Sequence, residues 1–156
     1  MLGDYIVSLE MKFLVGFVFV FVSGFLIGYE RGSRGKKAGV RTNTMVCMGA
    51  MLYALISNHV DPSSLTRIAA GVVTGIGFLG AGIIMHHKGS VEGLTTAATI
   101  WMSAAIGVAI GFGWYLVAVM ATLLGFLVLR MPHIGEHRDA HQKRNKKTKR
   151  KILQRK

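Results

Sequence analysis

One pattern in this sequence has a known chemical use. Gly75 to Gly80 reads GIGFLG, which matches the G-x-G-x-x-G pattern of dinucleotide-binding loops. Such a loop needs a preceding strand, a following helix and an acidic residue about 20 positions further on. Here the pattern lies inside an apolar segment, 68–85, that is long enough to be a membrane helix. We therefore reject a nucleotide-binding site.

Other candidates for chemistry are polar residues close to the ends of apolar segments. They are Glu30, Arg31, Arg41, Thr42, Glu92, Thr95 and Thr96. Because a charge near a membrane must be paired or solvated, one interpretation pairs the two carboxylates with Arg31 and Arg41. A docking surface for a partner protein and a site for a cation or small ligand are the alternatives. No catalytic triad, carboxylate pair in a cleft or phosphate loop is recognisable, so we do not expect an enzyme.

Composition indicates what kind of scaffold carries these residues. The chain has 156 residues, of which 51% are hydrophobic and 20 are glycine. Soluble domains rarely combine these features, whereas membrane helices tolerate glycine because it lets helices approach closely. The expected fold is all-α, a polytopic integral membrane protein whose transmembrane domain covers residues 1–131.

Hydropathy divides this domain into about five transmembrane helices, since a span needs about 20 apolar residues and at least about 17. We place the spans near 13–29, 42–60, 68–85, 94–111 and 115–129. The last two come from one stretch without charge between Glu92 and Arg130, which is too long for a single crossing. The turn at 111–114 is the expected point of reversal, with Trp114 and Tyr115 at the membrane interface.

Basic residues predict the orientation of the chain. Of the 19 Lys and Arg residues, five lie between Arg31 and Arg41, one is Lys88 and eleven lie between Arg130 and Lys156. With five spans, these seventeen fall on one side and only two on the other. We therefore expect the C-terminus to be cytoplasmic and the N-terminus to be outside.

The segment 132–156 is expected to be a disordered cytoplasmic tail, because blocks of like charge rarely fold. Holding the tail inside is its first expected role, and association with anionic lipid is the second. No aromatic residue interleaves the basic run, so we expect no nucleic acid partner. Its histidines, His133, His137 and His141, are too loosely arranged to name a metal site.

Glycines four residues apart occur in three of the expected spans. The pairs are Gly24 and Gly28, Gly71 and Gly75, and Gly107 and Gly111, with Gly77, Gly80 and Gly82 further along the third span. One helical turn of separation puts both members of a pair on one face, where another backbone can approach closely. We expect packing within one chain, and homo-oligomerisation is the alternative.

Several blocks of sequence resemble the signature of the MgtC/SapB family. They are GYER at 28–31, AGVRT at 38–42, RIAA at 67–70, GIGFLGAG at 75–82, and GLTTAAT at 93–99 followed by Trp101, Ala104, Ala105 and Gly107. The resemblance covers about 24–129 in the family's order and spacing. It implies a bacterial inner-membrane protein linked to growth under low magnesium, to survival inside host phagocytes and, in some members, to restraint of the F-type ATP synthase.

The sequence departs from the family pattern in three places. Asp61 and Pro62 are separated from Arg67 by an insertion-like segment, so the outer-side motif formed by Asp61 and Arg67 is stretched. Gly71 replaces a frequent glutamine. The basic tail stands where longer members have a soluble C-terminal domain, so the chain resembles a short, SapB-like form.

The resemblance and the missing catalytic equipment together favour a regulatory protein that contributes to magnesium homeostasis or to stress and virulence adaptation through a membrane partner. The F-type ATP synthase is the partner that the resemblance implies. A magnesium or other ion transporter is the alternative, with backbone carbonyls, Thr74, Thr99 and Ser103 along the pathway and Glu30 or Glu92 at its mouth. We expect no cofactor, and whether magnesium or another metal binds is left open.

Overall fold

The computed structural model describes residues 2–87 and 90–131, which form five α-helices and a short β-hairpin. The helices are α1 (Leu2–Ser33), α2 (Val40–Val60), α3 (Leu65–Ile83), α4 (Leu94–Gly111) and α5 (Tyr115–Arg130), with a single 3-10 turn, η1, at Pro62–Ser64. Strands β1 (Met85–His87) and β2 (Ser90–Glu92) pair antiparallel between α3 and α4. The predicted all-α class is confirmed, and the hairpin is an addition in the polar segment that follows α3. The predicted tail, 132–156, lies outside the described residues.

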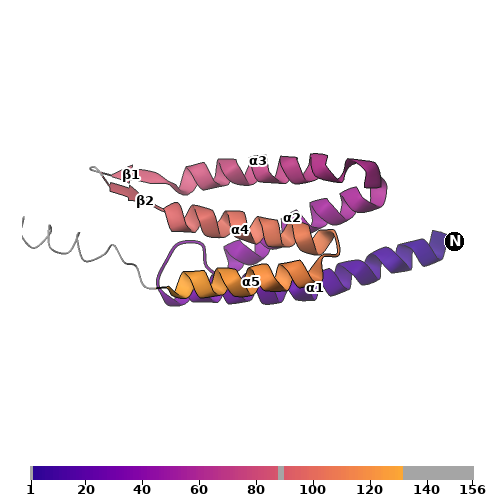
Figure 1. The fold of residues 1–156 in the computed structure, drawn as a ribbon, viewed down its shortest axis with the longest axis horizontal. Coiled ribbons are helices and arrows are strands. Elements are labelled where there is room, and N and C mark those ends of the chain that lie inside the picture. Colours follow the sequence, from indigo (N-terminus) through magenta and orange to yellow (C-terminus); the bar gives the residue numbers. More distant parts are fainter. Residues whose placement is uncertain (1, 88–89, 132–156) are drawn as a thin grey trace, which may run out of the picture.

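The five helices run alternately up and down one long axis (Figure 1). The loop between α1 and α2, the β-hairpin and the end of α5 lie at one end of the bundle. The N-terminus, η1 and the turn between α4 and α5 lie at the other. Segments 31–41 and 90–96 are far apart in sequence but share the same end of the bundle.

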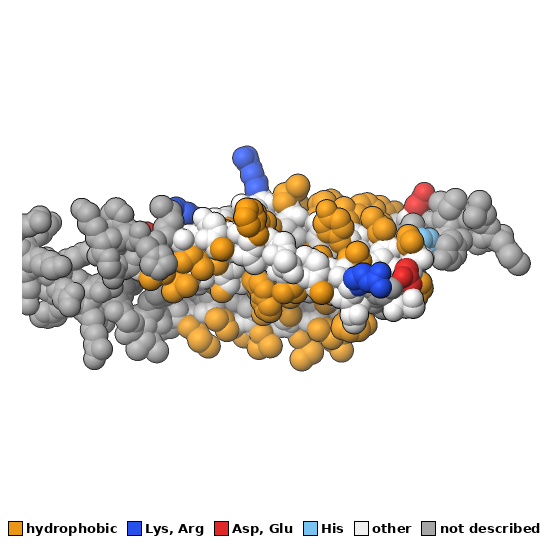
Figure 2. All heavy atoms as spheres, turned by 90° about the horizontal axis from the view of Figure 1, so that it is seen from above, with side chains coloured by type: hydrophobic (Ala, Val, Ile, Leu, Met, Phe, Trp, Pro, Cys, Tyr) orange, Lys and Arg blue, Asp and Glu red, His pale blue; other side chains and the backbone are white. Residues whose placement is uncertain are grey.

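Helix length and composition agree with a membrane protein. Among the described residues, three segments are long and apolar enough to cross a membrane, Glu10–Ser33 with 24 residues and Thr66–Ile83 and Leu94–Gly111 with 18 each. Helix α5 is apolar but has only 16 residues. Figure 2 shows mostly hydrophobic side chains over the middle of the visible face, as expected for a surface in contact with lipid.

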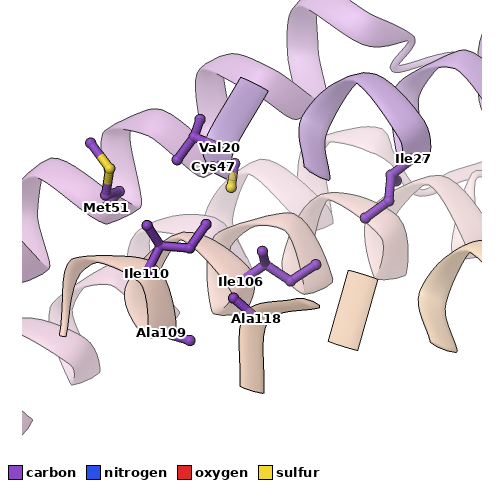
Figure 3. Close-up of a cluster of buried hydrophobic side chains, with 8 residues drawn as sticks. All are labelled: Val20, Ile27, Cys47, Met51, Ile106, Ala109, Ile110 and Ala118. Atoms are coloured by element: carbon purple, nitrogen blue, oxygen red, sulfur yellow. The ribbon is translucent and has the colours of Figure 1, made fainter. Parts of the chain in front are cut away.

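The buried core is built from α1, α2, α4 and α5. Its buried members converge between these four helices (Figure 3). They are Val20 and Ile27, Cys47 and Met51, Ile106, Ala109 and Ile110, and Ala118. Helix α3 contributes none of them and packs along α4 and α2 from outside.

Glycine makes the contact between α2 and α4 unusually close. A methyl group on Gly107 would collide with the carbonyl oxygen of Cys47 and lie 2.9 Å from the Ala50 Cβ. At Gly111 it would collide with the carbonyl oxygen of Met51 and lie 2.6 Å from Ala54 Cβ. The two helices can therefore meet backbone to backbone only while both positions of α4 have no side chain.

Gly107→Ala is expected to destabilise the fold by about 1–3 kcal/mol, the usual effect of overpacking, despite a gain of up to about 1 kcal/mol in helix propensity. Gly49→Ala in α2 is the matched control, because a methyl group there meets no heavy atom within 4 Å. Equilibrium unfolding in mixed micelles measures both. Equal stability of the two variants would contradict the close contact between α2 and α4.

Candidate functional site

The buried amide of Asn43 joins the loop, α2 and α4 at the end of the bundle that carries the polar cluster. Its side chain is fully buried, and its Nδ2 donates to the carbonyl oxygens of Ala38 and Gly39 at 2.7 and 3.0 Å. Its Oδ1 accepts a hydrogen bond of 2.9 Å from the Ser103 hydroxyl of α4. Ala38 has a φ of 59°, so the loop adopts a left-handed turn at the point that Asn43 binds. Asn43 therefore attaches the loop between α1 and α2 to α4.

Glu30 is buried on α1 with two cationic partners. Its Oε1 lies 2.6 Å from Arg34 Nη2, and its Oε2 lies 3.5 Å from Arg130 Nε at the end of α5. The guanidinium of Arg130 also lies 4.9 Å from the centre of the Phe126 ring. The expected partners, Arg31 and Arg41, are not the ones that Glu30 uses, because neighbouring residues on a helix do not face each other and i,i+4 residues do.

Arg31 is the most deeply buried cation of the cluster, with 4% of its surface exposed. Its Nη2 donates to the hydroxyl of Thr96 on α4 and to the carbonyl oxygen of Lys37 at 3.2 Å. Its Nε is buried and has no hydrogen-bond partner. Among the described residues, Arg31 forms no ion pair with a carboxylate.

A cavity of about 550 Å³ opens beside Arg31. Its walls come from the loop between α1 and α2, the end of α3, β2 and the first turn of α4. The polar and charged side chains that line it are Arg31, Lys36, Lys37, Glu92, Thr95 and Thr96. Four members of the predicted cluster therefore share one cavity.

The other predicted residues of this cluster lie outside the cavity. Glu30 faces Arg34 and Arg130, as described above. Arg41 and Thr42 are exposed in the first turn of α2, and Thr42 lines a separate groove against α3 and Ile100. The predicted cluster is thus divided among three neighbouring environments.

The predicted outer-side residues lie at the opposite end of the bundle. Asp61 Oδ1 accepts hydrogen bonds from the backbone N–H of Ser63 at 3.1 Å and from the Ser63 hydroxyl, which fixes η1. Arg67 is exposed near the start of α3. Asp61 therefore shapes the link between α2 and α3.

The predicted packing glycines fall into two groups. Gly24 and Gly28 of α1 lie against the start of α2, where an added Cβ would approach Thr44 Cα and Val40 N to 2.6 Å each. Gly107 and Gly111 lie against the middle of α2. At Gly80 an added Cβ would lie 3.7 Å from the Cβ of Ala97 on α4. By contrast, an added Cβ would meet no heavy atom within 4 Å at any of Gly71, Gly75, Gly77 and Gly82. These four glycines of α3 therefore make no close contact with another helix of the chain, contrary to the prediction that they pack within one chain.

Two of these four glycines line an apolar groove of about 620 Å³. It runs between α2 and α3, and Gly71 and Gly75 form part of one wall while Met45 and Tyr53 form part of the other. Apart from Gly80, no residue of the apolar segment Thr66–Ile83 is buried inside the chain. Helix α3 therefore presents an uncovered apolar surface that carries glycine.

Asn43, Arg34 and Arg130 are site residues that sequence reasoning missed. The sequence contains a signal for Asn43, since an amide one residue inside an apolar segment needs hydrogen-bond partners. It also contains one for Arg34, which follows Glu30 by one helical turn. The sequence contains no signal for Arg130, because only the packing of α5 on α1 brings it to Glu30. Among the described residues, no group of three or more His, Cys, Asp or Glu side chains is placed to hold a metal ion.

The comparisons with known proteins point to one family. The sequence model of the MgtC family matches residues 17–137. Protein MgtC of Salmonella typhimurium strain LT2 is 46% identical over 116 residues, which cover 74% of this chain and 50% of that protein. Protein MgtC of Brucella abortus strain 2308 is 52% identical over 104 residues, which cover 66% of this chain and 44% of that protein. The chain spans about half the length of these relatives, and no solved structure matches it.

Thr96→Val is expected to destabilise the fold by about 1–3 kcal/mol, because it removes the side-chain acceptor of a buried guanidinium. Thr95→Val is the matched control, since Thr95 is the adjacent, exposed threonine of the same turn. Equilibrium unfolding in mixed micelles again gives the readout. A Thr95→Val variant as unstable as Thr96→Val would show that the hydrogen bond from Arg31 contributes nothing.

Proposed function

The chain belongs to the MgtC family, and from this premise we propose that it binds and regulates a partner protein in the bacterial inner membrane. Such regulation would contribute to magnesium homeostasis or to stress and virulence adaptation. Both physiological roles rest on family resemblance. The F-type ATP synthase is the partner that the same resemblance implies.

The observation that carries this proposal is the uncovered surface of α3. This helix is long and apolar enough to cross a membrane, yet apart from Gly80 no residue of its 18-residue segment is buried. Gly71, Gly75 and Gly82 recur at helical spacing on one side, where a second helix can approach the backbone closely. Phe78 lies on the same side and is 81% exposed. A helix of a partner protein fits this surface, and a second copy of the chain is the alternative occupant.

The proposed topology has the N-terminus outside, several membrane crossings and a cytoplasmic C-terminus. The loop between α1 and α2, the hairpin and the end of α5 lie at one end of the bundle (Figure 1). Seventeen of the 19 Lys and Arg residues lie in 31–41, which covers this loop and the adjoining helix ends, in the segment of the hairpin, or from Arg130 onward. This asymmetry supports a cytoplasmic location for that end, where the basic tail would meet anionic lipid.

The alternative function, transport of magnesium or another ion, has weaker physical support. Magnesium requires oxygen ligands in octahedral geometry, often including a carboxylate. Glu30 is a buried carboxylate, but Arg34 and Arg130 already face it. The hydroxyls of Ser23, Ser103 and Thr122 are engaged in hydrogen bonds between helices. These groups are better suited to fixing helix positions than to exchanging ions.

Partner binding predicts that Gly75→Leu lowers crosslinking in the membrane by about tenfold or more, because a bulky side chain prevents close helix approach. A photoreactive residue at position 78 reports on the surface, and mass spectrometry identifies the adducts. Gly77→Leu is the matched control, since Gly77 is equally open but lies on a different side of α3. An adduct with an ATP synthase subunit that persists in Gly77→Leu supports the proposal. Adducts only between two copies, or equal yields in both variants, contradict it.

Regulation without transport predicts that sealed proteoliposomes containing the purified chain show no saturable magnesium uptake. An internal magnesium-sensitive dye follows uptake, and a known channel reconstituted in parallel tests the vesicles. Glu30→Gln and Glu92→Gln are the diagnostic variants, one buried and one exposed. Saturable flux that Glu30→Gln abolishes would replace the regulatory proposal with a transporter whose mouth is cytoplasmic.

A further inference from the structure

We propose that the cavity between the α1–α2 loop and the start of α4 binds a phosphate-type oxyanion, either free phosphate or the phosphate of a lipid headgroup. The proposal rests on the residues of the cavity and does not depend on which protein binds α3. Its lining residues are polar and basic on one side, namely Arg31, Lys36 and Lys37, and form the first turn of a helix on the other.

The first argument is the incomplete pairing of Arg31. A guanidinium has five N–H donors in a planar fork that matches the oxygens of phosphate. Both recorded hydrogen bonds of Arg31 use Nη2, and its buried Nε has no acceptor. Only 4% of the surface of Arg31 is exposed. No carboxylate among the described residues forms an ion pair with it. A buried charge without a counter-ion is costly, so an anion in the adjoining cavity would supply the missing partner.

The second argument is the N-terminus of α4. This helix has 18 residues, and its N-cap residue, Gly93, makes no side-chain cap. The first N–H groups of a helix have no acceptor within the helix, and the helix dipole makes this end favourable for anions. Gly93, Leu94, Thr95 and Thr96 line the cavity, so this end of α4 faces it. Backbone amides and Arg31 would therefore meet the same oxyanion.

Gly93 keeps this helix end open for a steric reason. Its φ of 90° is left-handed, and an added Cβ would collide with the carbonyl oxygen of Ile83. The residues that normally cap a helix, Ser, Thr, Asp and Asn, all carry a Cβ. The packing of α3 on this position thus excludes a capping side chain and leaves the first amides of α4 available.

The charge of the cavity also favours an anion. Three cations line it, Arg31, Lys36 and Lys37, against one carboxylate, Glu92, which is exposed to solvent. Apolar residues complete the wall, namely Ile83, Val91 and Leu94. An apolar wall beside a phosphate site suits a lipid headgroup, while the cations and amides suit either source.

The test compares two probes on the full chain purified in a neutral detergent. Equilibrium dialysis with radiolabelled inorganic phosphate measures free oxyanion, and native mass spectrometry with phosphatidylglycerol measures the lipid source. Diacylglycerol, which lacks the phosphate, controls for binding by the acyl chains. The basic tail is present in every sample, so differences between variants report on the cavity.

Lys36→Gln combined with Lys37→Gln is expected to weaken phosphate or phosphatidylglycerol binding by about tenfold, because charge-assisted hydrogen bonds are lost. Arg31→Gln is expected to weaken it at least as much. Arg34→Gln is the matched control, since Arg34 belongs to the same basic segment but pairs with Glu30 and does not line the cavity. Circular dichroism confirms folding, and the double lysine variant keeps the test decisive if Arg31→Gln does not fold.

Loss of phosphate binding in the cavity variants but not in Arg34→Gln assigns the site to free oxyanion. The same pattern with phosphatidylglycerol alone assigns it to a lipid headgroup. Absence of binding by both probes, equal weakening by Arg34→Gln, or equal binding of diacylglycerol would overturn the proposal.

Discussion

The backbone contact between α2 and α4 is the constraint on which the rest of the structure depends. Gly107 and Gly111 let α4 lie against the carbonyl oxygens of Cys47 and Met51, at a distance that no side chain permits. This contact places the Ser103 hydroxyl beside Asn43 and Thr96 beside Arg31. The polar groups at the end of the bundle are therefore positioned by an apolar contact in its middle. In a bilayer, where burial of apolar surface gives little driving force between helices, such close packing supplies much of the stability.

Because α2 and α4 pack closely against each other, α3 remains on the outside of the bundle. It packs along α4 and α2, contributes nothing to the buried cluster and leaves four of its five glycines exposed. A helix of this kind in water would be a liability, whereas in lipid its apolar surface is compatible with the solvent. The chain thus combines a tightly packed group of four helices with a fifth that has a free face.

Sequence alone predicted the class of fold and the family, because hydropathy, helix length and the block motifs are local signals. It predicted that Glu30, Arg31, Glu92 and Thr96 gather at one end, since alternating helices bring every second connection to the same side. It did not predict that Glu30 binds Arg34 and Arg130, because the second of these contacts depends on how α5 packs on α1. For the same reason, spacing identified the glycine pairs but gave no way to distinguish Gly107, which meets α2, from Gly75, which meets open space.

The two surfaces that carry the proposals meet at one point of the fold. Ile83, the last residue of α3, lines the cavity, and its carbonyl oxygen lies against Gly93, the N-cap residue of α4. A side chain at position 93 would cap α4 only by pushing away the end of α3, since the Cβ would occupy the place of that oxygen. The same glycine therefore lets the end of α3 lie against the start of α4 and provides no side chain to cap the first amides of α4. This coupling follows from the backbone conformation at Gly93, whose φ of 90° only glycine adopts without strain.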